Sequence, residues 1–239
     1  MIMKKNTFLQ AEWRKLVMAN YSVDKNLLKP FLPYNTEFDL LKDTCYLSLV
    51  GFMFLNTKVK GIKIPFHSNF EEVNLRFYVR YNDKGEWKRG TVFIKEIVPK
   101  AAITFVANTI YGENYETMPM KHFWITGNEF LDVEYKWKKK RWNSIKVIAS
   151  KELYKIEKGS EEEFITEHYW GYTKVKDNQT FEYKVEHPVW EIYKTKDYII
   201  DVDFGDNYGS QFEFLKDETP QSVFLAEGSE IKVKEGSEI

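Results

Sequence analysis

The feature of this chain that most constrains its fold is an alternation of apolar and polar side chains with a period of two. The clearest case is EVNLRFYVRY at residues 72–81. Successive side chains of a β-strand point to opposite faces, so this run predicts a strand with one apolar and one polar face. The apolar face would carry Val73, Leu75, Phe77, Val79 and Tyr81, and the polar face Asn74, Arg76, Tyr78 and Arg80.

Similar runs recur along the chain and predict many strands. Residues 45–56 are almost all apolar, which indicates a strand buried on both faces. Residues 81–87 (YNDKGEW) predict a hairpin turn, because Asn, Asp and Gly tolerate turn geometries. Further strands are predicted at residues 90–98, 131–138, 143–150, 163–174, 180–187, 189–194 and 229–234. Evenly spaced strands with few helices are typical of a closed or strongly curved antiparallel sheet, and a barrel of this kind can enclose a small-ligand pocket.

Three segments carry helical signals instead. Residues 22–33 begin near the capping candidate Asp24 and continue with apolar residues at helical spacing. Residues 99–112 (PKAAITFVANTIYG) form the clearest predicted helix, with Pro99 suited to its first position. Residues 219–228 open on Thr-Pro and end on Gly, which predicts a third, short helix.

Composition narrows the class of protein. The 239 residues, 43% of them hydrophobic, suffice for one sizeable core, and no linker divides them, so we expect a single domain over residues 1–239. The net charge of -1 gives no general attraction to nucleic acid or to an anionic membrane. Apolar runs are too short to span a bilayer, and the N-terminus lacks the apolar stretch of a secretory signal. Cys45 is the single cysteine, which excludes an internal disulfide and favours a cytoplasmic location.

Lys100 lies where the strand 90–98 meets the predicted helix, and it is a candidate nucleophile. In the first turn of that helix, the helix dipole would disfavour an ammonium by roughly 0.3–1 kcal/mol, which is too little by itself to give a neutral amine. Burial or another cation would have to supply the rest. Glu96 is a candidate proton-transfer partner if the bend at Pro99 brings the two side chains together. The other interpretation is a solvated lysine at a strand–helix junction.

A histidine among aromatic residues marks a second candidate site. In the predicted strand 163–174, His168 shares a face with Trp170 and Tyr172, so these three are candidate ligand-binding residues. A core histidine with both nitrogens satisfied is the other interpretation.

A third group surrounds the start of the strand 72–81. His67 and Arg76 are candidates for ligand binding, and Glu71 is a candidate for catalysis. The four histidines show no fixed metal-ligand spacing, so no metal site is expected. Glycine motifs that hold dinucleotides or phosphates are absent from the sequence, so no cofactor is expected.

Several segments together resemble the YqjF-like family of bacterial proteins: LQAEWRKLVMANYSVDKNLLKPFLPYNTEFDL, SLVGFMF, IPFHSNFEEVNLRFYVR, KEIVPK, EFITEHYWGYT and PQSVFLAEGSEIKV. The resemblance extends over nearly the whole chain. The family is similar, more distantly, to acetoacetate decarboxylase. This implies the fold of that superfamily: mainly β, with a cone-shaped antiparallel β-barrel and a few flanking helices around an internal pocket.

The resemblance also implies roles for single residues. Acetoacetate decarboxylase forms a Schiff base through the first lysine of a Pro-Lys-Lys stretch, which Lys100 matches. Ala101 stands in place of the second lysine, whose charge activates the first. Arg14 falls in the place of the active-site arginine of that enzyme, and its guanidinium would suit a carboxylate. Glu71 or Glu72 is the nearest match to its catalytic glutamate.

Three functions follow as alternatives. The first is a pocket that binds a small carboxylate, or another anionic or aromatic ligand, without Schiff-base decarboxylation. The second is a decarboxylase-like enzyme that acts on a small oxo acid through Lys100 and Arg14. The third is a structural or interaction protein with a filled barrel. A small-molecule partner is expected, nucleic acid and membranes are not, and assembly into a homo-oligomer is left open.

Overall fold

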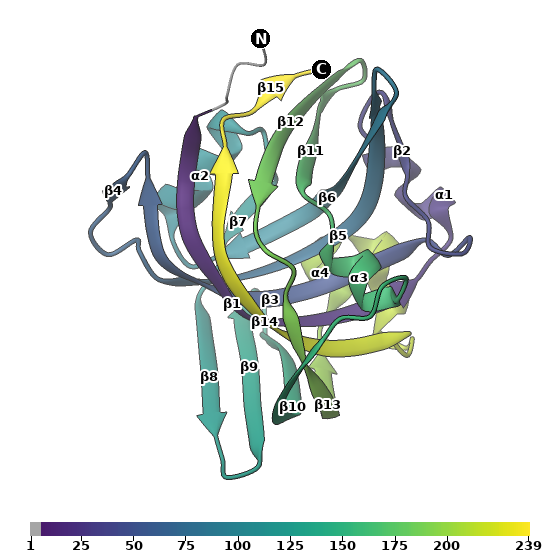
Figure 1. Cartoon of the computed structure of the whole chain (residues 1–239). Helices are drawn as coiled ribbons and strands as arrows, with labels where there is room; N and C mark the ends of the chain where they lie inside the picture. Colours follow the sequence, from purple (N-terminus) through teal and green to yellow (C-terminus); the bar gives the residue numbers. More distant parts are fainter. Residues whose placement is uncertain (1–5) are drawn as a thin grey trace.

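The computed structural model describes residues 6–239, whose strands join into one 15-stranded sheet (Figure 1). The strands are β1 (Thr7–Ser22), β2 (Thr36–Phe38), β3 (Tyr46–Val59), β4 (Ile62–Lys63), β5 (Phe70–Asp83), β6 (Glu86–Val98), β7 (Tyr115–Thr117), β8 (Met120–Thr126), β9 (Phe130–Lys138), β10 (Trp142–Lys155), β11 (Trp170–Lys176), β12 (Gln179–Glu186), β13 (Glu191–Asp201), β14 (Ser222–Lys234) and β15 (Ser237–Glu238). The α-helices are α1 (Lys25–Leu28), α2 (Ala101–Ile110), α3 (Glu161–Thr166) and α4 (Phe204–Tyr208), and the 3₁₀ segments are η1 (Lys29–Phe31) and η2 (Ser210–Lys216). The expectation about a secretory signal concerns in part residues 1–5, which lie outside the described range.

Seven strands close into a ring. Neighbouring strands follow the order β12-β11-β6-β5-β3-β1-β14, and β12 also pairs with β14 through Val185 and Val233. The predicted mainly β fold with a closed sheet is therefore confirmed. The ring departs from the expected purely antiparallel arrangement at one place, because β11 runs parallel to β6 at Trp170 and Gly90.

A second layer of strands extends from the ring. Strand β14 pairs with β12 near its C-terminal end and with β13 near Leu225, so β13, β10, β9 and β8 continue the sheet away from the ring (Figure 1). The chain therefore has two hydrophobic interiors. We call the cluster between the ring and this extension the outer core, and the cluster inside the ring the inner core.

The strands β1, β3 and β5 bury side chains in both cores. Along β5, Val73 and Leu75 lie in the outer core, whereas Phe70 and Tyr78 lie in the inner core. The predicted strand 45–56 is confirmed as buried on both faces, apart from its last two residues. The alternation in residues 72–81 was also predicted correctly, but most of its polar face does not meet solvent: Asn74, Arg76 and Tyr78 lie inside the ring, whereas Arg80 reaches the surface.

Three local predictions need correction. Helix α2 begins at Ala101, so Lys100 is its N-cap with extended backbone and Pro99 is not a helical residue. Residues 163–174 are not one strand, because α3 ends at Thr166 and β11 begins at Trp170. The predicted helix 219–228 is wrong, since β14 runs from Ser222 and pairs with β1 along most of its length.

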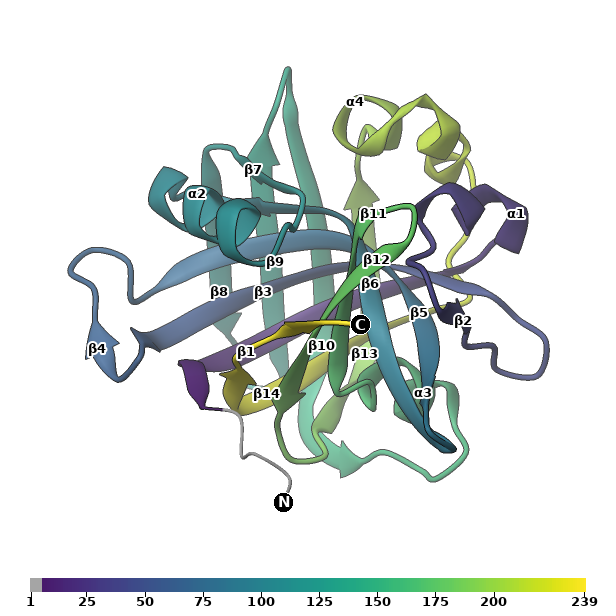
Figure 2. The same cartoon turned by 90° about the horizontal axis from the view of Figure 1, so that it is seen from above.

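The first predicted helix is confirmed in shortened form. Asp24 caps α1 by accepting a hydrogen bond from the backbone N–H of Asn26 at 2.8 Å. Helix α2 lies beside the ring next to β7, where it covers one side of the inner core (Figure 2). Within residues 6–239, no helix combines the length and apolar character needed to cross a membrane.

Candidate functional site

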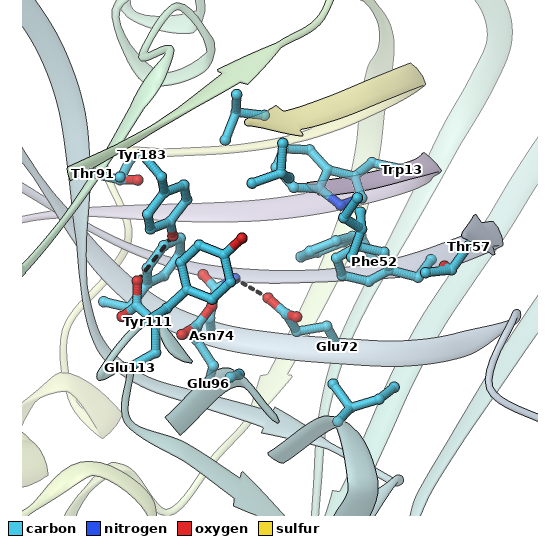
Figure 3. Close-up of a pocket in the computed structure, with 18 of the residues that line it drawn as sticks. Trp13, Phe52, Thr57, Glu72, Asn74, Thr91, Glu96, Tyr111, Glu113 and Tyr183 are labelled. Atoms are coloured by element: carbon cyan, nitrogen blue, oxygen red, sulfur yellow. Dashed lines mark hydrogen bonds between the residues drawn. The ribbon is translucent and has the colours of Figure 1, made fainter. Parts of the chain in front are cut away.

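A cavity of about 240 Å³ lies inside the ring of strands. Aromatic side chains such as Trp13 and Phe52 form one part of its wall, and three glutamates gather at another (Figure 3). Helix α2 contributes Ala102 and Val106 to the lining. The cavity is thus mostly apolar, with its charged groups concentrated in a few positions, as in many small-molecule sites.

The glutamates come from three different elements. Glu72 projects from β5, Glu96 from β6, and Glu113 from the loop after α2. Their exposed fractions are 2%, 2% and 8%, so all three are removed from bulk water. Glu96 pairs with Asn74 across the neighbouring strands β6 and β5. Asn74 is two positions from Glu72 on the same face of β5, so the side chains of Glu72 and Glu96 reach the same space.

Neutral donors satisfy two of these carboxyl groups. Glu72 accepts a hydrogen bond from Nδ2 of Asn74 at 2.9 Å and another from the hydroxyl of Tyr115 at 3.1 Å. Glu113 accepts one from the hydroxyl of Tyr183 at 2.9 Å. Within the described chain, no lysine lines the cavity and no ion pair neutralises these glutamates.

Burial therefore favours the protonated forms. It raises the pKa of Glu72 to about 7, against the opposing effect of the Asn74 and Tyr115 hydrogen bonds, and it raises the pKa of Glu113 to about 7. Burial, together with repulsion from Glu113 and Glu72, raises the pKa of Glu96 well above its usual range. At neutral pH the cluster holds protons inside an apolar space, so it can act as an acid.

Arg76 is the cation of this cavity. It projects from β5 on the same face as Glu72, and it is only 8% exposed. Its guanidinium lies 5.7 Å from the ring centroid of Tyr78, and its charge lowers the pKa values of Glu72 and Glu96. Among residues 6–239 its Nε is buried without a hydrogen-bond partner. Arg76 is therefore a buried charge that residues 6–239 leave without an ion-pair partner.

His168 lines the same cavity and is held by an aspartate. Its Nε2 lies 3.0 Å from Oδ2 of Asp39, which also accepts a hydrogen bond from Nε of Arg89 at 2.5 Å. Burial opposes ionisation of Asp39, but the hydrogen bonds from His168 and Arg89 lower the pKa of its carboxyl group. Burial also lowers the pKa of His168 to about 4, despite the Asp39 hydrogen bond. The imidazole is therefore neutral at neutral pH.

The structure brings five of the predicted site residues into one cavity lining: His67, Arg76, Glu96, His168 and Trp170. Tyr172 is not among them, because its side chain is fully buried in the outer core. The expected strand parity of His168, Trp170 and Tyr172 is wrong, since His168 lies in the loop between α3 and β11.

Lys100 and Glu71 lie outside the cavity lining. Glu71 occupies the opposite face of β5 from Glu72 and lies 2.7 Å from Nδ1 of His122 on β8. Burial opposes ionisation of Glu71, but its contacts with His122 and the charge of Lys100 lower the pKa of this carboxyl group. The charge of Lys100 thus acts on Glu71, and within residues 6–239 no hydrogen bond or ion pair joins Lys100 to Glu96, the condition on which their proposed partnership depended.

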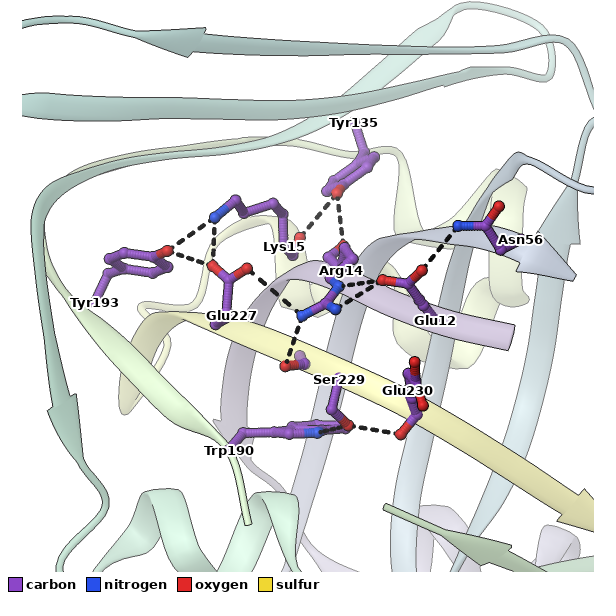
Figure 4. A network of polar contacts seen from close by, with 11 residues as sticks. Glu12, Arg14, Lys15, Asn56, Tyr135, Trp190, Tyr193, Glu227, Ser229 and Glu230 are labelled. Atoms are coloured by element: carbon purple, nitrogen blue, oxygen red, sulfur yellow. Dashed lines mark hydrogen bonds and ion pairs between the residues drawn. The ribbon is translucent and has the colours of Figure 1, made fainter. Parts of the chain in front are cut away.

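Arg14 also lies outside the cavity lining, in a network on the outer side of β1 and β14 (Figure 4). Its Nε and Nη2 donate to Oε2 of Glu12 at 2.9 and 2.7 Å, and its Nη1 lies 3.7 Å from Glu227. The neighbouring Lys15 donates to Glu227 and to Tyr193. Since two carboxylates already surround Arg14, the network leaves little positive charge for an external anion.

Sequence reasoning missed Glu113, Tyr115 and Tyr183, which complete the acidic end of the cavity. Glu113 lies in the turn that follows α2, and Tyr115 begins the short strand after it. The sequence there has no periodicity that would predict which way these side chains point. Tyr183 belongs to the alternating run of β12, and this alternation predicts a strand but does not mark Tyr183 as a site residue. In the described part of the chain, no group of three or more His, Cys, Asp or Glu side chains is arranged to hold a metal ion.

Solved structures show that this fold occurs in known enzymes. The chain aligns over its whole length with 92% of acetoacetate decarboxylase from Legionella pneumophila, at a TM-score of 0.66 and 12% identity. It aligns over 98% of its length with 94% of an acetoacetate decarboxylase-like enzyme from Sphingomonas wittichii, at a TM-score of 0.67 and 9% identity. The enduracididine biosynthesis enzyme MppR, complexed with pyruvate, gives a TM-score of 0.64 at 10% identity, covering 99% of this chain and 91% of that one. The expected acetoacetate-decarboxylase-like fold is confirmed.

Sequence comparison identifies the family. The uncharacterized protein YqjF of Bacillus subtilis is 30% identical over 77 residues, which span 32% of each chain, or about a third of that relative. A family model described as an uncharacterized conserved protein, DUF2071, matches residues 10–230. The match covers most of the chain and agrees with the predicted YqjF-like resemblance, so this protein belongs to the DUF2071 family.

Proposed function

We propose that this protein binds a small organic acid inside the ring of strands, without forming a Schiff base. The carboxylate of the ligand pairs with Arg76, and its apolar or aromatic body lies against the aromatic wall that includes Trp13 and Phe52. The observation that carries this proposal is the guanidinium of Arg76, which is buried in the cavity wall and unpaired among the described residues.

The energetic reason is that an unpaired buried charge is costly. Removing an ion from water costs several kcal/mol in a real protein, and a well-placed counter-ion recovers part of that cost. A guanidinium offers parallel N–H donors that fit a carboxylate in bidentate geometry. Because Glu72, Glu96 and Glu113 hold protons near neutral pH, they do not neutralise Arg76 fully, and an anionic ligand meets a net positive site.

The size and lining of the cavity set the ligand class. Drug-sized ligands occupy pockets of roughly 300–1,000 Å³, and this cavity of about 240 Å³ is smaller. The apolar wall favours a ligand with one charged end and a compact hydrophobic remainder. The structural relatives support a small acid, because they include an acetoacetate decarboxylase and MppR complexed with pyruvate.

The two alternative functions are less well supported. A Schiff-base decarboxylase would need an amine in the cavity, whereas no lysine lines it in residues 6–239 and Lys100 and Arg14 lie elsewhere. A filled barrel would leave no internal space, whereas the ring encloses a cavity with charged groups on its wall.

The test is binding of phenylpyruvate at about pH 6, where the glutamates are protonated. Binding is followed by tryptophan fluorescence, because Trp13, Trp170 and Trp190 line the cavity. We expect the wild type to bind phenylpyruvate and not its neutral amide, phenylpyruvamide. Arg76→Gln should lose affinity roughly 10-fold or more, the value of a hydrogen bond to a charged group.

Arg80→Gln is the matched control. Arg80 lies on the same strand, but its side chain is 43% exposed and pairs with Glu37 at the surface. Equal affinity of the wild type and Arg76→Gln for phenylpyruvate would remove Arg76 from the site. Equal affinity of the wild type for the acid and the amide would show that the cavity does not select a carboxylate.

A further inference from the structure

The cavity contains an oriented base whose reactive atom has no partner. The Asp39 carboxylate can only accept hydrogen bonds, so the Nε2 of His168 that faces it carries the hydrogen. The Nδ1 of the same ring therefore presents a lone pair. The side chain of His168 is only 1% exposed, so Nδ1 is shielded from bulk water. Nδ1 also has no hydrogen-bond partner in the described chain.

A merely structural histidine would not explain this arrangement well. Buried polar atoms are nearly always hydrogen-bonded, and an orphan in a native fold needs a reason. The rings of Tyr78 and Phe164 pack against His168 with centroids 4.7 and 5.1 Å away, so they fix the imidazole without satisfying Nδ1. Asp39 and Arg89 fix the other side of the ring. His168 is thus held rigidly with one free acceptor beside the cavity.

An acid with a free oxygen lines the same cavity. Oε2 of Glu96 is buried without a hydrogen-bond partner, although Tyr115 and Arg76 lie close to the carboxyl group. The cavity therefore contains two unpartnered polar atoms of complementary kind: a nitrogen that can take a proton and a carboxyl group that can give one. The guanidinium of Arg76 completes the set as the group that would hold a substrate carboxylate.

We propose that the cavity catalyses enolisation of a 2-oxo acid, with His168 as the base and Glu96 as the acid. This inference rests on the proposed function, because Arg76 must first bind the carboxylate of the substrate. The C3–H bond breaks and its hydrogen moves as a proton to Nδ1 of His168, while its electron pair forms the C2=C3 double bond. The carbonyl oxygen takes the proton of the Glu96 carboxyl group and becomes the enol hydroxyl.

No redox partner is needed, and the reverse reaction restores the oxo acid. The imidazolium that forms is stabilised by the Asp39 carboxylate, so Asp39 acts as a positioning residue. Each cycle replaces a C3 proton by one from solvent, because the protonated histidine exchanges before it returns its proton. The detectable product is therefore a 2-oxo acid labelled at C3, or its enol tautomer.

The experiment follows phenylpyruvate in D₂O by proton NMR. The rate of loss of its C3 protons is measured above the buffer rate, while affinity is measured separately by tryptophan fluorescence. We expect wild-type protein to accelerate exchange. His168→Gln and Glu96→Gln should each lower this rate roughly 100-fold or more, the usual contribution of a general acid or base, while the affinity for phenylpyruvate changes less than about threefold. His122→Gln, which alters a histidine outside the cavity, should exchange like the wild type.

The outcomes separate the two proposals. Binding without accelerated exchange would overturn the enolisation and leave the binding function standing, whereas absence of binding would overturn both. Exchange by His168→Gln at the wild-type rate would remove His168 as the base. If His168→Gln does not fold, Glu96→Gln decides, because an unchanged rate in that variant would overturn the acid–base pair.

Discussion

Replacing Glu72 by glutamine tests the buried acid cluster in the unliganded protein. Glutamine cannot ionise, and its amide has an oxygen that accepts hydrogen bonds and an NH2 group that donates them. It therefore stands in for the protonated acid beside Asn74 and Tyr115. Burial raises the pKa of Glu72 from 4.5 to about 7, which is a difference of about 2.5. At 1.36 kcal/mol for each unit, the folded state stands to lose about 3 kcal/mol when this group ionises.

The direction of the effect follows from the raised pKa. The favourable contribution of protonated Glu72 is fully present below its unfolded pKa of about 4.5, and it is lost as the pH rises through the folded value of about 7. Glu72→Gln cannot ionise, so it should keep its stability over this window. Relative to the wild type, the variant should therefore become more stable by up to about 3 kcal/mol between about pH 5 and about pH 9.

Urea denaturation at several pH values measures this difference. Glu152→Gln is the control, because it makes the same substitution at an exposed residue of β10. The free energy of unfolding of the variant is compared with that of the wild type at each pH. Groups that titrate alike in both proteins then contribute nothing to the difference. A difference for Glu72→Gln that stays flat from about pH 5 to about pH 9 would refute the raised pKa and with it the acid cluster.

Further predictions concern the ligand, the lysine and the packing of the cavity. Affinity for phenylpyruvate should fall as the pH rises through about 7, because ionised Glu72 and Glu113 repel a carboxylate, and equal affinities on both sides of this pH would contradict it. Borohydride trapping with acetoacetate or pyruvate, followed by peptide mapping, should give no rapid stoichiometric labelling of Lys100. Gly171→Ala should lower the free energy of unfolding by about 1–3 kcal/mol, because a Cβ there would lie 2.2 Å from the ring of Tyr183; unchanged urea stability would show that the ring moves freely.

The fold class could be predicted because period-two alternation survives in most strands. Alternation predicts the runs at 72–81 and 131–138, a continuous apolar run predicts 45–56, and each lies in a strand of the structure. Closure of the ring was a weaker inference, because the pairing of Val185 with Val233 joins residues far apart in the sequence. No local pattern specifies such a pairing.

The two wrong elements have different causes. At α3 the local sequence favours a helix over the predicted strand: Ser160 accepts a hydrogen bond from the N–H of Glu163, and the carboxylate of Glu163 accepts one from the N–H of Gly159. At residues 219–228 the local signal itself was misleading. The Thr-Pro opening and the glycine indicate a helix, but hydrogen bonding of β14 to β1 determines the conformation.

The candidate site was partly predictable, and the reason lies in the polar face of β5. Alternation showed that Asn74 and Arg76 share one face, but it could not show that this face looks into a closed ring. A polar face on an open sheet is solvated, whereas the same face inside a ring becomes the wall of a site. Glu113 escaped prediction altogether, because a single glutamate in a turn resembles any solvated loop residue.

The charges of the cavity also support the proposal that this protein binds an acid without the imine chemistry of a decarboxylase. An amine becomes a nucleophile at neutral pH when apolar surroundings or a second cation destabilise its ammonium form. Here three glutamates share the cavity, and any that ionised beside a lysine would stabilise the ammonium instead. The same carboxyl groups, held protonated by burial, leave Arg76 free to attract an anion and can themselves donate protons. The electrostatics of this ring therefore support the proposed acid–base chemistry over imine formation, whichever residue occupies position 100.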